Sequence, residues 1–335
     1  DIFKIALTND NNFSISFFNY GGYIHSILIP NLNNNLNEDV VLGYNNFEGY
    51  LKDSSYFNCI VGRVCGRIGN SHFFLNNKEY KLFSNLGPDH IHGGQYGFNK
   101  KIWDIVDIQK NAEQISCSLN YLSPHMEEGY PGNLYCNVNY LLNNKNEFII
   151  KFQAKGDEDT IVNLTNHNYW NFHGHNDNYQ NALEHMIRLS CSSYLETSKE
   201  LIPTGVIKNI LDKKIDFRKL KNITEEILAE GGNNLCYGVD SYDGSIKDIA
   251  EIYSIKTHIG MQLSSDQPGL QFYTGNFMDD SYQGKNYRTY GYQYGICLEP
   301  EIFPDAINHP KFKSPILRLG NTYSSTTIMT LRNDF

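Results

Sequence analysis

The sequence lacks any long hydrophobic run and any excess of basic residues. No apolar stretch reaches the roughly 18 residues that a membrane-spanning helix requires, and no signal-peptide pattern is visible, so we expect a cytoplasmic protein with no membrane partner. The formal net charge of -9 leaves no basic stripe to neutralise phosphates, which argues against a nucleic acid partner. A neutral or weakly polar small molecule suits this charge better.

Paired cysteines and phosphate-binding motifs are also missing. The seven cysteines are odd in number and contain no Cys-x-x-Cys pair, so the sequence predicts neither a disulfide framework nor a zinc ribbon but buried thiols in a reducing compartment. The glycine-rich residues 62–69 contain neither a Gly-x-Gly-x-x-Gly nor a Gly-Lys-Ser/Thr element, which excludes the common nucleotide-binding fingerprints.

Aromatic residues are abundant instead. The 24 Tyr and 19 Phe help bring aromatics to 13%, which favours strands over helices and supplies flat surfaces for sugar rings. Alternating apolar residues predict strands at 13–17 and 23–29, and the polar tract at 31–37 predicts a hairpin loop. No linker or internal repeat divides the chain, so we expect one large antiparallel all-β domain over residues 1–335. Helical patterns are confined to residues 47–53, 176–186 and 224–229.

The chemistry is expected to centre on a strand near the end of the chain. Apolar residues alternate along 294–298, so Cys297 and Glu299 share the opposite face of the strand. Pro300 has no N–H to donate, and we expect it to end the regular pairing of this strand. A carboxylate held rigidly at that point suits a general base, while a solvated acidic residue is the plainer alternative.

Two histidine segments supply candidate partners. His90 and His92 point the same way on an extended segment, a spacing that also suits a metal if a third ligand is supplied. Gly93 immediately after them indicates a backbone that passes close to something, such as a ligand. His167 lies in a dense polar and aromatic segment, 163–172, which predicts either a hydrogen-bonded corner or a polar pocket.

Further polar residues complete the set. Arg67 is a natural donor to sugar hydroxyls, whereas a structural salt bridge is expected for Arg63. Gln271 follows a Pro-Gly turn on a short strand, and Asp240 is a carboxylate in a turn that alone carries no meaning. Together these groups suit proton transfer on a polyhydroxylated neutral ligand. His173 and His175, in a Gly/Asn-rich loop, are expected to be solvated.

Taken together, segments along essentially the whole chain resemble the aldose 1-epimerase (galactose mutarotase) family. Each segment is a weak signal, but their order is specific. The matching segments are residues 19–22, 41–43, 62–63 with 67–68, 92–94 with 97–98, 128–134, 163–169, 202–205, 216–218, 271–276, 298–299 and 303–306. The resemblance implies a large antiparallel β-sandwich with a few short helices and an open cleft for a free aldohexose such as D-galactose or D-glucose.

The same resemblance implies the activity and the roles of residues. The enzyme would interconvert α and β anomers by opening and reclosing the ring, without metal or redox cofactor, as a monomer or weak dimer. Glu299 matches the general base, His167 the acid that protonates the ring oxygen, and His92 a second histidine near that oxygen. At ordinary pKa values of about 4.3 and 6.5, the carboxylate is ionised and the imidazole can carry a proton. The residues that match hydroxyl-binding positions are Arg67, Asp240 and Gln271.

Three positions depart from the family pattern, and three other functions stay open. Gly66 replaces a usual asparagine, Ser241 a common histidine, and Glu301 a frequent glutamine. If Glu301 faces the cleft beside Glu299, its charge should raise the pKa of the base. A hexose-6-phosphate epimerase would need basic residues beyond 100–101. The remaining alternatives are a catalytically silent sugar-binding module and a zinc enzyme built on His90 and His92.

Overall fold

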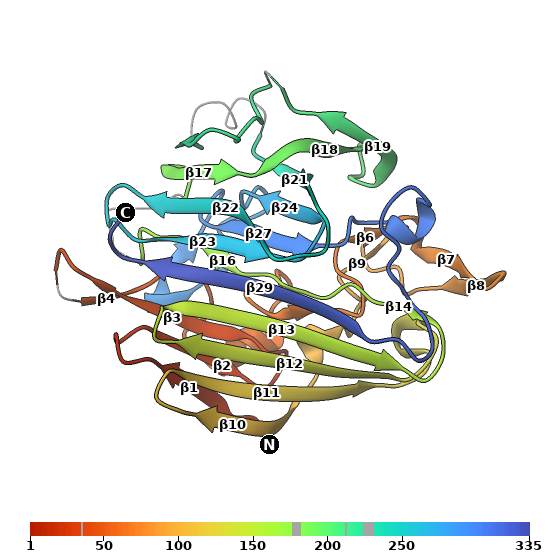
Figure 1. Ribbon diagram of the computed structural model, residues 1–335, viewed down its shortest axis with the longest axis horizontal. Helices are drawn as coiled ribbons and strands as arrows, with labels where there is room; N and C mark the ends of the chain where they lie inside the picture. The colour runs from red at the N-terminus through yellow and green to blue at the C-terminus, as the bar shows by residue number, and fades with distance from the viewer. Residues whose placement is uncertain (35, 176–181, 212, 224–230) are drawn as a thin grey trace.

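The computed structural model describes residues 1–34, 36–175, 182–211, 213–223 and 231–335. Within these ranges the largest sheet has nine strands, and every strand pair in it is antiparallel. Its long strands run one above another across the front of Figure 1. In spatial order the strands are β10 (Asp104–Lys110), β11 (Gln114–Ser123), β12 (Leu134–Asn143), β13 (Glu147–Gly156), β29 (Tyr323–Arg332), β23 (Gly260–Ser265), β22 (Lys247–Ser254), β17 (His185–Leu189) and β20 (Lys221–Asn222).

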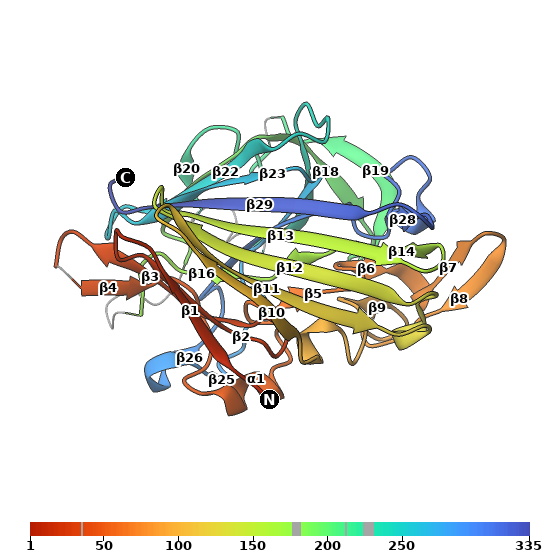
Figure 2. The same ribbon diagram turned by 60° about the horizontal axis from the view of Figure 1, so that its bottom comes forward.

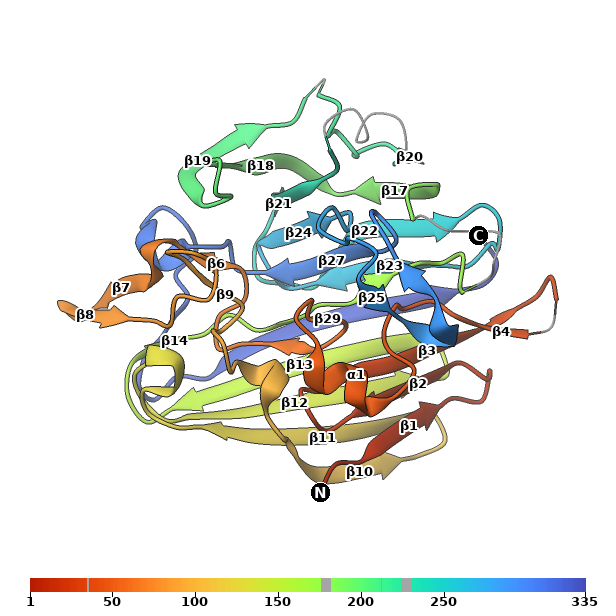
Figure 3. The same ribbon diagram turned by 180° about the vertical axis from the view of Figure 1, so that it is seen from behind.

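A second, six-stranded antiparallel sheet lies behind part of the first, as the view from behind in Figure 3 shows. Its strands alternate between residues that face the first sheet and residues that face away from it. Leu263 on β23 packs in one buried cluster with Phe272 and Leu298 of the second sheet, which makes the two sheets a sandwich. In spatial order the strands are β16 (Tyr169–Trp170), β27 (Ile296–Glu301), β24 (Gly269–Tyr273), β21 (Asn234–Val239), β18 (Cys191–Thr197) and β19 (Pro203–Asn209).

A four-stranded meander extends this core at the beginning of the chain: β1 (Lys4–Thr8), β2 (Ser14–Phe18), β3 (Ile24–Asn31) and β4 (Leu36–Asp39). Both predicted strands are confirmed, and the polar tract connects β3 to β4, as a hairpin loop should. The predicted helical turn is also confirmed as α1 (Phe47–Lys52), where the Asn46 side chain caps the Gly49 N–H.

Short elements gather on the face seen in Figure 3 and carry several site residues. They are brief because each turns sharply: a residue with positive φ lies inside or beside most of them. The strand pairs are β5 (Ile60–Val61) with β15 (Thr165–Asn166), β6 (Arg67–Ile68) with β9 (His90–Ile91), β7 (His72–Leu75) with β8 (Lys78–Lys81), β14 (Thr160–Ile161) with β28 (Ile316–Leu317), and β25 (Tyr282–Gln283) with β26 (Thr289–Tyr290). The 3-10 helices are η1 (Gly69–Ser71), η2 (Phe98–Lys100), η3 (Glu127–Gly129), η4 (Lys285–Tyr287) and η5 (Ala306–Asn308).

Other expectations have mixed outcomes. The helix predicted at 224–229 lies outside the described residues, and so does most of the one predicted at 176–186, whose last residues belong to strand β17. All seven cysteines are buried and free, which confirms the prediction of buried thiols. In the described ranges no helix is long and apolar enough to cross a membrane. Figure 2 shows the nine-stranded sheet arching over the shorter elements.

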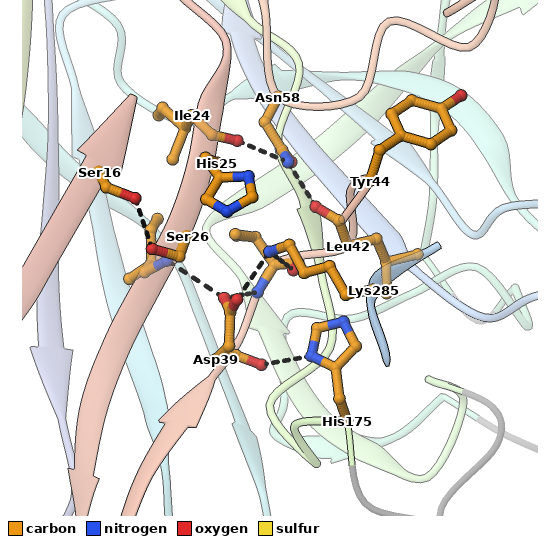
Figure 4. Close-up of polar contacts among 12 residues, drawn as sticks. Ser16, Ile24, His25, Ser26, Asp39, Leu42, Tyr44, Asn58, His175 and Lys285 are labelled. Carbon is orange, nitrogen blue, oxygen red and sulfur yellow. Dashed lines mark hydrogen bonds and ion pairs between the residues drawn. The ribbon is translucent and has the colours of Figure 1, made fainter. Parts of the chain in front are cut away.

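A polar cluster ties strand β4 to the segment around η4 (Figure 4). The Lys285 ammonium donates to the Asp39 carboxylate at 2.7 Å and to the Val41 carbonyl at 2.8 Å. One ring nitrogen of His175 contacts the Asp39 carbonyl at 3.0 Å and the other contacts the Tyr290 hydroxyl at 2.9 Å. His173 is buried, and His175 is half-buried with both ring nitrogens bonded, so the expectation that these two loop histidines are solvated is wrong.

Candidate active site

A cavity of about 690 Å³ opens between the second sheet and the short elements of the face seen in Figure 3. Five of the six residues singled out in the sequence line it, although they come from distant parts of the chain. Asp240 is not among its lining residues. The five are Arg67, His92, His167, Gln271 and Glu299.

Glu299 is positioned by strand β27, which does not end at Pro300. Pro300 pairs in register with Leu270, and Glu301 still pairs with Gly269 on β24. The missing N–H is tolerated because the other neighbour, β16, pairs only with the first two residues of β27. The expectation that Pro300 ends regular pairing is therefore wrong, and Glu299 and Glu301 share one face of the strand and both line the cavity.

The polar segment before His167 fixes the far end of β27. The Thr165 hydroxyl donates to the Pro300 carbonyl at 2.9 Å. The Asn163 side chain both donates to and accepts from the backbone of Ile302, at 2.8 and 2.9 Å. The segment 163–172 is therefore a hydrogen-bonded corner that also contributes residues to the pocket. Both structures predicted for this polar segment are present.

His167 lies directly against Glu299. Its Nε2 is 3.6 Å from the Glu299 Oε1, and its Nδ1 is 3.5 Å from the Cys297 sulfur. The Tyr169 ring stacks on the imidazole at 4.9 Å with an interplanar angle of 18°. The His167 N–H also donates to the Cys59 carbonyl, so backbone and ring are both held. The nitrogen that faces the carboxyl group is the one available for proton exchange.

His92 lies against His167 at the cavity, with ring centroids 5.2 Å apart and an interplanar angle of 76°. The Gly66 N–H donates to the His92 Nδ1 at 3.3 Å, so a neutral His92 carries its proton on Nε2. A Cβ at Gly93 would lie 1.8 Å from the Gly62 carbonyl oxygen. The predicted close approach after His92 is thus confirmed, but its partner is backbone and not a ligand.

His90 points away from this site. Its Nδ1 contacts the Phe83 carbonyl at 2.8 Å and its Nε2 contacts the Tyr130 hydroxyl at 2.6 Å. Both ring nitrogens are engaged, so His90 and His92 do not form a metal-binding pair. In the described ranges, the ligand atoms of His167, Cys297 and Glu299 do lie within 4.8 Å of one another. The thiol and the carboxyl face opposite nitrogens of the ring, so these contacts do not define one ion position.

Burial changes the protonation of the site. It raises the pKa of Glu299 well above its ordinary value, with Glu301 adding to the rise and Arg67 opposing it. It lowers the pKa of His167 to about 4 and that of His92 well below its ordinary value, where the charges of His167 and Arg67 add to the effect. The expectation of ordinary values is wrong, because desolvation disfavours every charged form here. Burial therefore favours the neutral carboxylic acid of Glu299 and the neutral imidazole of His167 over their charged forms.

Gln271 and a residue missed in the sequence line the cavity beside Glu299, on the same face of the second sheet. Gln271 lies across from Glu299 in the strand register, and its Nε2 donates to the Asn234 Oδ1 at 2.7 Å. Asn234 also lines the cavity, but one asparagine in an asparagine-rich chain gives no sequence signal. Asp240 instead accepts from the Ser192 N–H at 2.8 Å and the Ser192 hydroxyl at 2.6 Å, so its carboxylate stabilises a strand junction.

Arg63 is structural, as expected, but its partners are neutral. The buried guanidinium donates to the Ser123 hydroxyl and to the carbonyls of Ser123, Pro124 and Pro131, at 2.8 to 2.9 Å. No ion pair of Arg63 occurs in the described part of the chain. Arg67, four residues later, faces the cavity, so only one of the two arginines is available to a ligand.

The fold and the cavity define a class of protein before any comparison: a large antiparallel β-sandwich with a paired carboxyl and imidazole at a polar cleft, suited to acid–base chemistry on a small hydroxylated molecule. Sequence comparison narrows this class. A sequence model of the family described as aldose 1-epimerase matches residues 4–330. The chain belongs to the aldose 1-epimerase family.

Individual relatives support this assignment. Galactose mutarotase from Bos taurus is 37% identical over 295 residues, which cover 86% of this chain and 82% of the bovine protein. Aldose 1-epimerase from Escherichia coli (strain K12) is 30% identical over 332 residues, which cover 96% of this chain and 93% of the bacterial protein. These matches confirm the predicted family and the predicted enzyme class, a carbohydrate isomerase.

Solved structures confirm the predicted fold. The aldose epimerase homologue from C. elegans matches with a TM-score of 0.90 and 26% identity over 100% of both chains. Galactose 1-epimerase from Lactobacillus acidophilus NCFM matches with a TM-score of 0.85 and 24% identity, over 100% of this chain and 96% of the other. The sandwich is therefore shared over its whole length.

Proposed function

We propose that Glu299 and His167 catalyse the interconversion of the α and β anomers of free aldohexoses such as D-galactose and D-glucose. The activity is that of the family, mutarotation of aldoses. The observation that carries the roles is the pairing of the two groups: Nε2 and Oε1 lie 3.6 Å apart at the wall of a cavity large enough for a monosaccharide. The free aldohexose, the cytoplasmic location and the monomeric or weakly dimeric state stay predictions.

One proton shared by Glu299 and His167 suffices for the reaction. Transfer of that proton from Glu299 to His167 creates the carboxylate and imidazolium that the chemistry needs, without a change in net charge. The carboxylate then removes the proton from the anomeric hydroxyl, the C1–O5 bond breaks as the C1 carbonyl forms, and His167 protonates O5. Rotation about C1–C2 and the reverse steps close the other anomer, and the pair ends with the single proton it began with.

The surrounding groups orient the sugar and stabilise charge. Neutral His92, with its proton on Nε2, serves as a hydrogen-bond donor near the ring oxygen and not as a second acid. Arg67 and Gln271 bind hydroxyl groups of the sugar. Asn234, which lines the cavity, binds a hydroxyl group in place of Asp240, which does not line it. Held dipoles of this kind stabilise charge better than water does, because they need no reorganisation during the reaction.

The charges of the cavity favour a neutral sugar over a sugar phosphate. Its lining contains two cations and four carboxyl groups. The two lysines at 100–101 do not form a basic rim, since Lys100 donates to the Asp53 carbonyl and Lys101 pairs with Glu127. A phosphate dianion would find no excess of cations here. The cations are Arg67 and Lys199, and the carboxyl groups are Asp89, Glu200, Glu299 and Glu301.

Polarimetry tests the proposal. Wild-type protein should accelerate the rotation change of freshly dissolved α-D-galactose or α-D-glucose, and Glu299→Gln should keep the fold but lose about 10³-fold in kcat, since it removes the proton acceptor. Asp240→Asn, which alters a carboxylate outside the cavity, is the matched control and should keep its rate. An equally active Glu299→Gln would remove Glu299 from the mechanism and leave only the family assignment.

A further inference from the structure

We propose that Glu301 is a second carboxyl group that contacts the substrate and selects the sugar by binding a hydroxyl other than the anomeric one. This inference rests on the proposed function, because it places the anomeric hydroxyl at Glu299. The family resemblance assigns no role to this position, where glutamine is frequent. The case rests on four features of Glu301: an oxygen without a hydrogen-bond partner, a glycine beside the carboxyl group, the spacing along the strand and the neighbouring polar groups.

The Glu301 side chain is buried and incompletely bonded. The residue is 2% exposed, yet it lines the cavity. Its Oε2 accepts the Cys65 S–H at 3.0 Å, while its Oε1 has no hydrogen-bond partner. The Nε of Arg67, which lines the same cavity, has none either. A buried polar atom without a partner costs about 1–3 kcal/mol, so two at one cavity wall indicate that a ligand supplies the missing bonds.

Gly66 places no side chain beside this carboxyl group. Its φ of +71° lies in the left-handed region, which favours glycine. A Cβ at this position would lie 3.5 Å from the Glu301 Oε2 and 3.0 Å from two carbons of Pro304. Any larger side chain would therefore run beside the carboxyl group and shield it. The combination of glycine at 66 and a carboxylic acid at 301 opens a polar subsite that an asparagine at 66 would occupy.

The strand spacing separates this subsite from the reacting carbon. Glu299 and Glu301 are two residues apart on the same face of β27, which places their Cα atoms about 6.6–6.8 Å apart. A pyranose ring with its hydroxyls spans a similar distance. A sugar with its anomeric hydroxyl at Glu299 would thus present a hydroxyl from another ring position to Glu301.

A hydroxyl group suits the chemistry of the subsite because it donates and accepts at once. It would accept from the Arg67 Nε–H and exchange a hydrogen bond with the Glu301 Oε1. Burial raises the pKa of Glu301 to about 7, and the nearby Cys65 and Cys236 thiols and the charge of Arg67 limit the rise. The titratable or charged groups around it are Cys65, Arg67, Cys236 and Glu299. The subsite therefore changes from donor to acceptor close to neutral pH.

Steady-state mutarotation kinetics between pH 5.5 and 8.5 test this role on a hexose and its 2-, 3-, 4- and 6-deoxy analogues. We expect Glu301→Gln to raise KM about tenfold for the parent hexose with kcat within about threefold, and to lose the change in KM near pH 7. The penalty should vanish for the one analogue that lacks the contacted hydroxyl. Asp240→Asn, the matched control, should change none of these values.

The outcomes separate the two proposals. Unchanged KM values and pH profile in Glu301→Gln, beside an inactive Glu299→Gln and an active wild type, would overturn the role of Glu301 alone. A wild type that turns over no hexose would overturn the proposed function first. If Glu301→Gln fails to fold, the wild-type enzyme alone tests the proposal. Its KM for one deoxy analogue relative to the parent hexose should then change as the pH passes 7. A KM ratio that is the same at all pH values would contradict the proposal.

Discussion

Two regions of this molecule bury charged groups beside histidines, and they differ in how completely those groups are paired. In the cluster of Asp39, His175 and Lys285, the ammonium and both imidazole nitrogens have partners within 3.0 Å. In the cavity, Glu301 and Arg67 keep buried atoms without partners. The first arrangement stabilises the fold, and the second leaves bonding capacity for a substrate.

The largest effect on stability is expected in the paired cluster. Lys285→Met removes the cation and leaves the Asp39 carboxylate without it, in a place where Lys285 is only 6% exposed. Breaking such a pair should lower the free energy of unfolding by about 4 kcal/mol. Urea denaturation measures this change, and the rate per folded molecule at low temperature should stay at the wild-type value. A large loss of rate without a loss of stability would contradict the claim that this cluster stabilises the fold and takes no part in the reaction.

A gain in stability is expected in the cavity. The folded-state pKa of Glu301, about 7, lies above its ordinary value of 4.5, so the native state binds the proton more tightly. Its stabilising contribution is present below pH 4.5 and is lost as the pH rises through 7. Glu301→Gln has no proton to lose in this range. Its free energy of unfolding should therefore rise by about 2 kcal/mol relative to that of wild type as the pH is raised from 5 to 8. Denaturation at both pH values checks the sign, and a relative loss would contradict it.

A smaller effect is expected at His175. His175→Gln removes one of two ring contacts, with the Asp39 carbonyl or the Tyr290 hydroxyl, and should destabilise the protein by about 1 kcal/mol. Thermal unfolding measures the loss. If instead the variant is as stable as wild type, the hydrogen bonds of the paired cluster do not support the fold as we describe.

The sequence sufficed for the fold class and most of the site because those signals are local. Alternation predicted the strands, and Glu299, His167 and His92 each lie in a distinctive segment. Asp240 and Asn234 show the limit, since Asn234 begins strand β21 beside Gln271 at the cavity, whereas Asp240 follows the end of that strand and binds Ser192. Sequence spacing carries no such information.

The sequence also does not show which strands pair or which charged and histidine side chains are buried. The rule that proline ends a strand assumes neighbours on both sides, and Pro300 has a strand partner on one side only. Ordinary pKa values for Glu299 and His167 fail because desolvation comes from residues distant in the chain. The histidines at 173 and 175 resemble a loop in sequence, yet they are held by partners from β22 and β26.

The most direct test compares two histidines, His167 at the cavity and His175 in the cluster with Asp39 and Lys285. The mutarotation rate of D-galactose, followed by polarimetry, should fall about 10²-fold or more in His167→Gln, which removes the proton donor, and stay within about twofold of wild type in His175→Gln. Equal losses in both variants, or a His167→Gln enzyme as fast as wild type, would contradict the claim that the Glu299–His167 pair moves the protons.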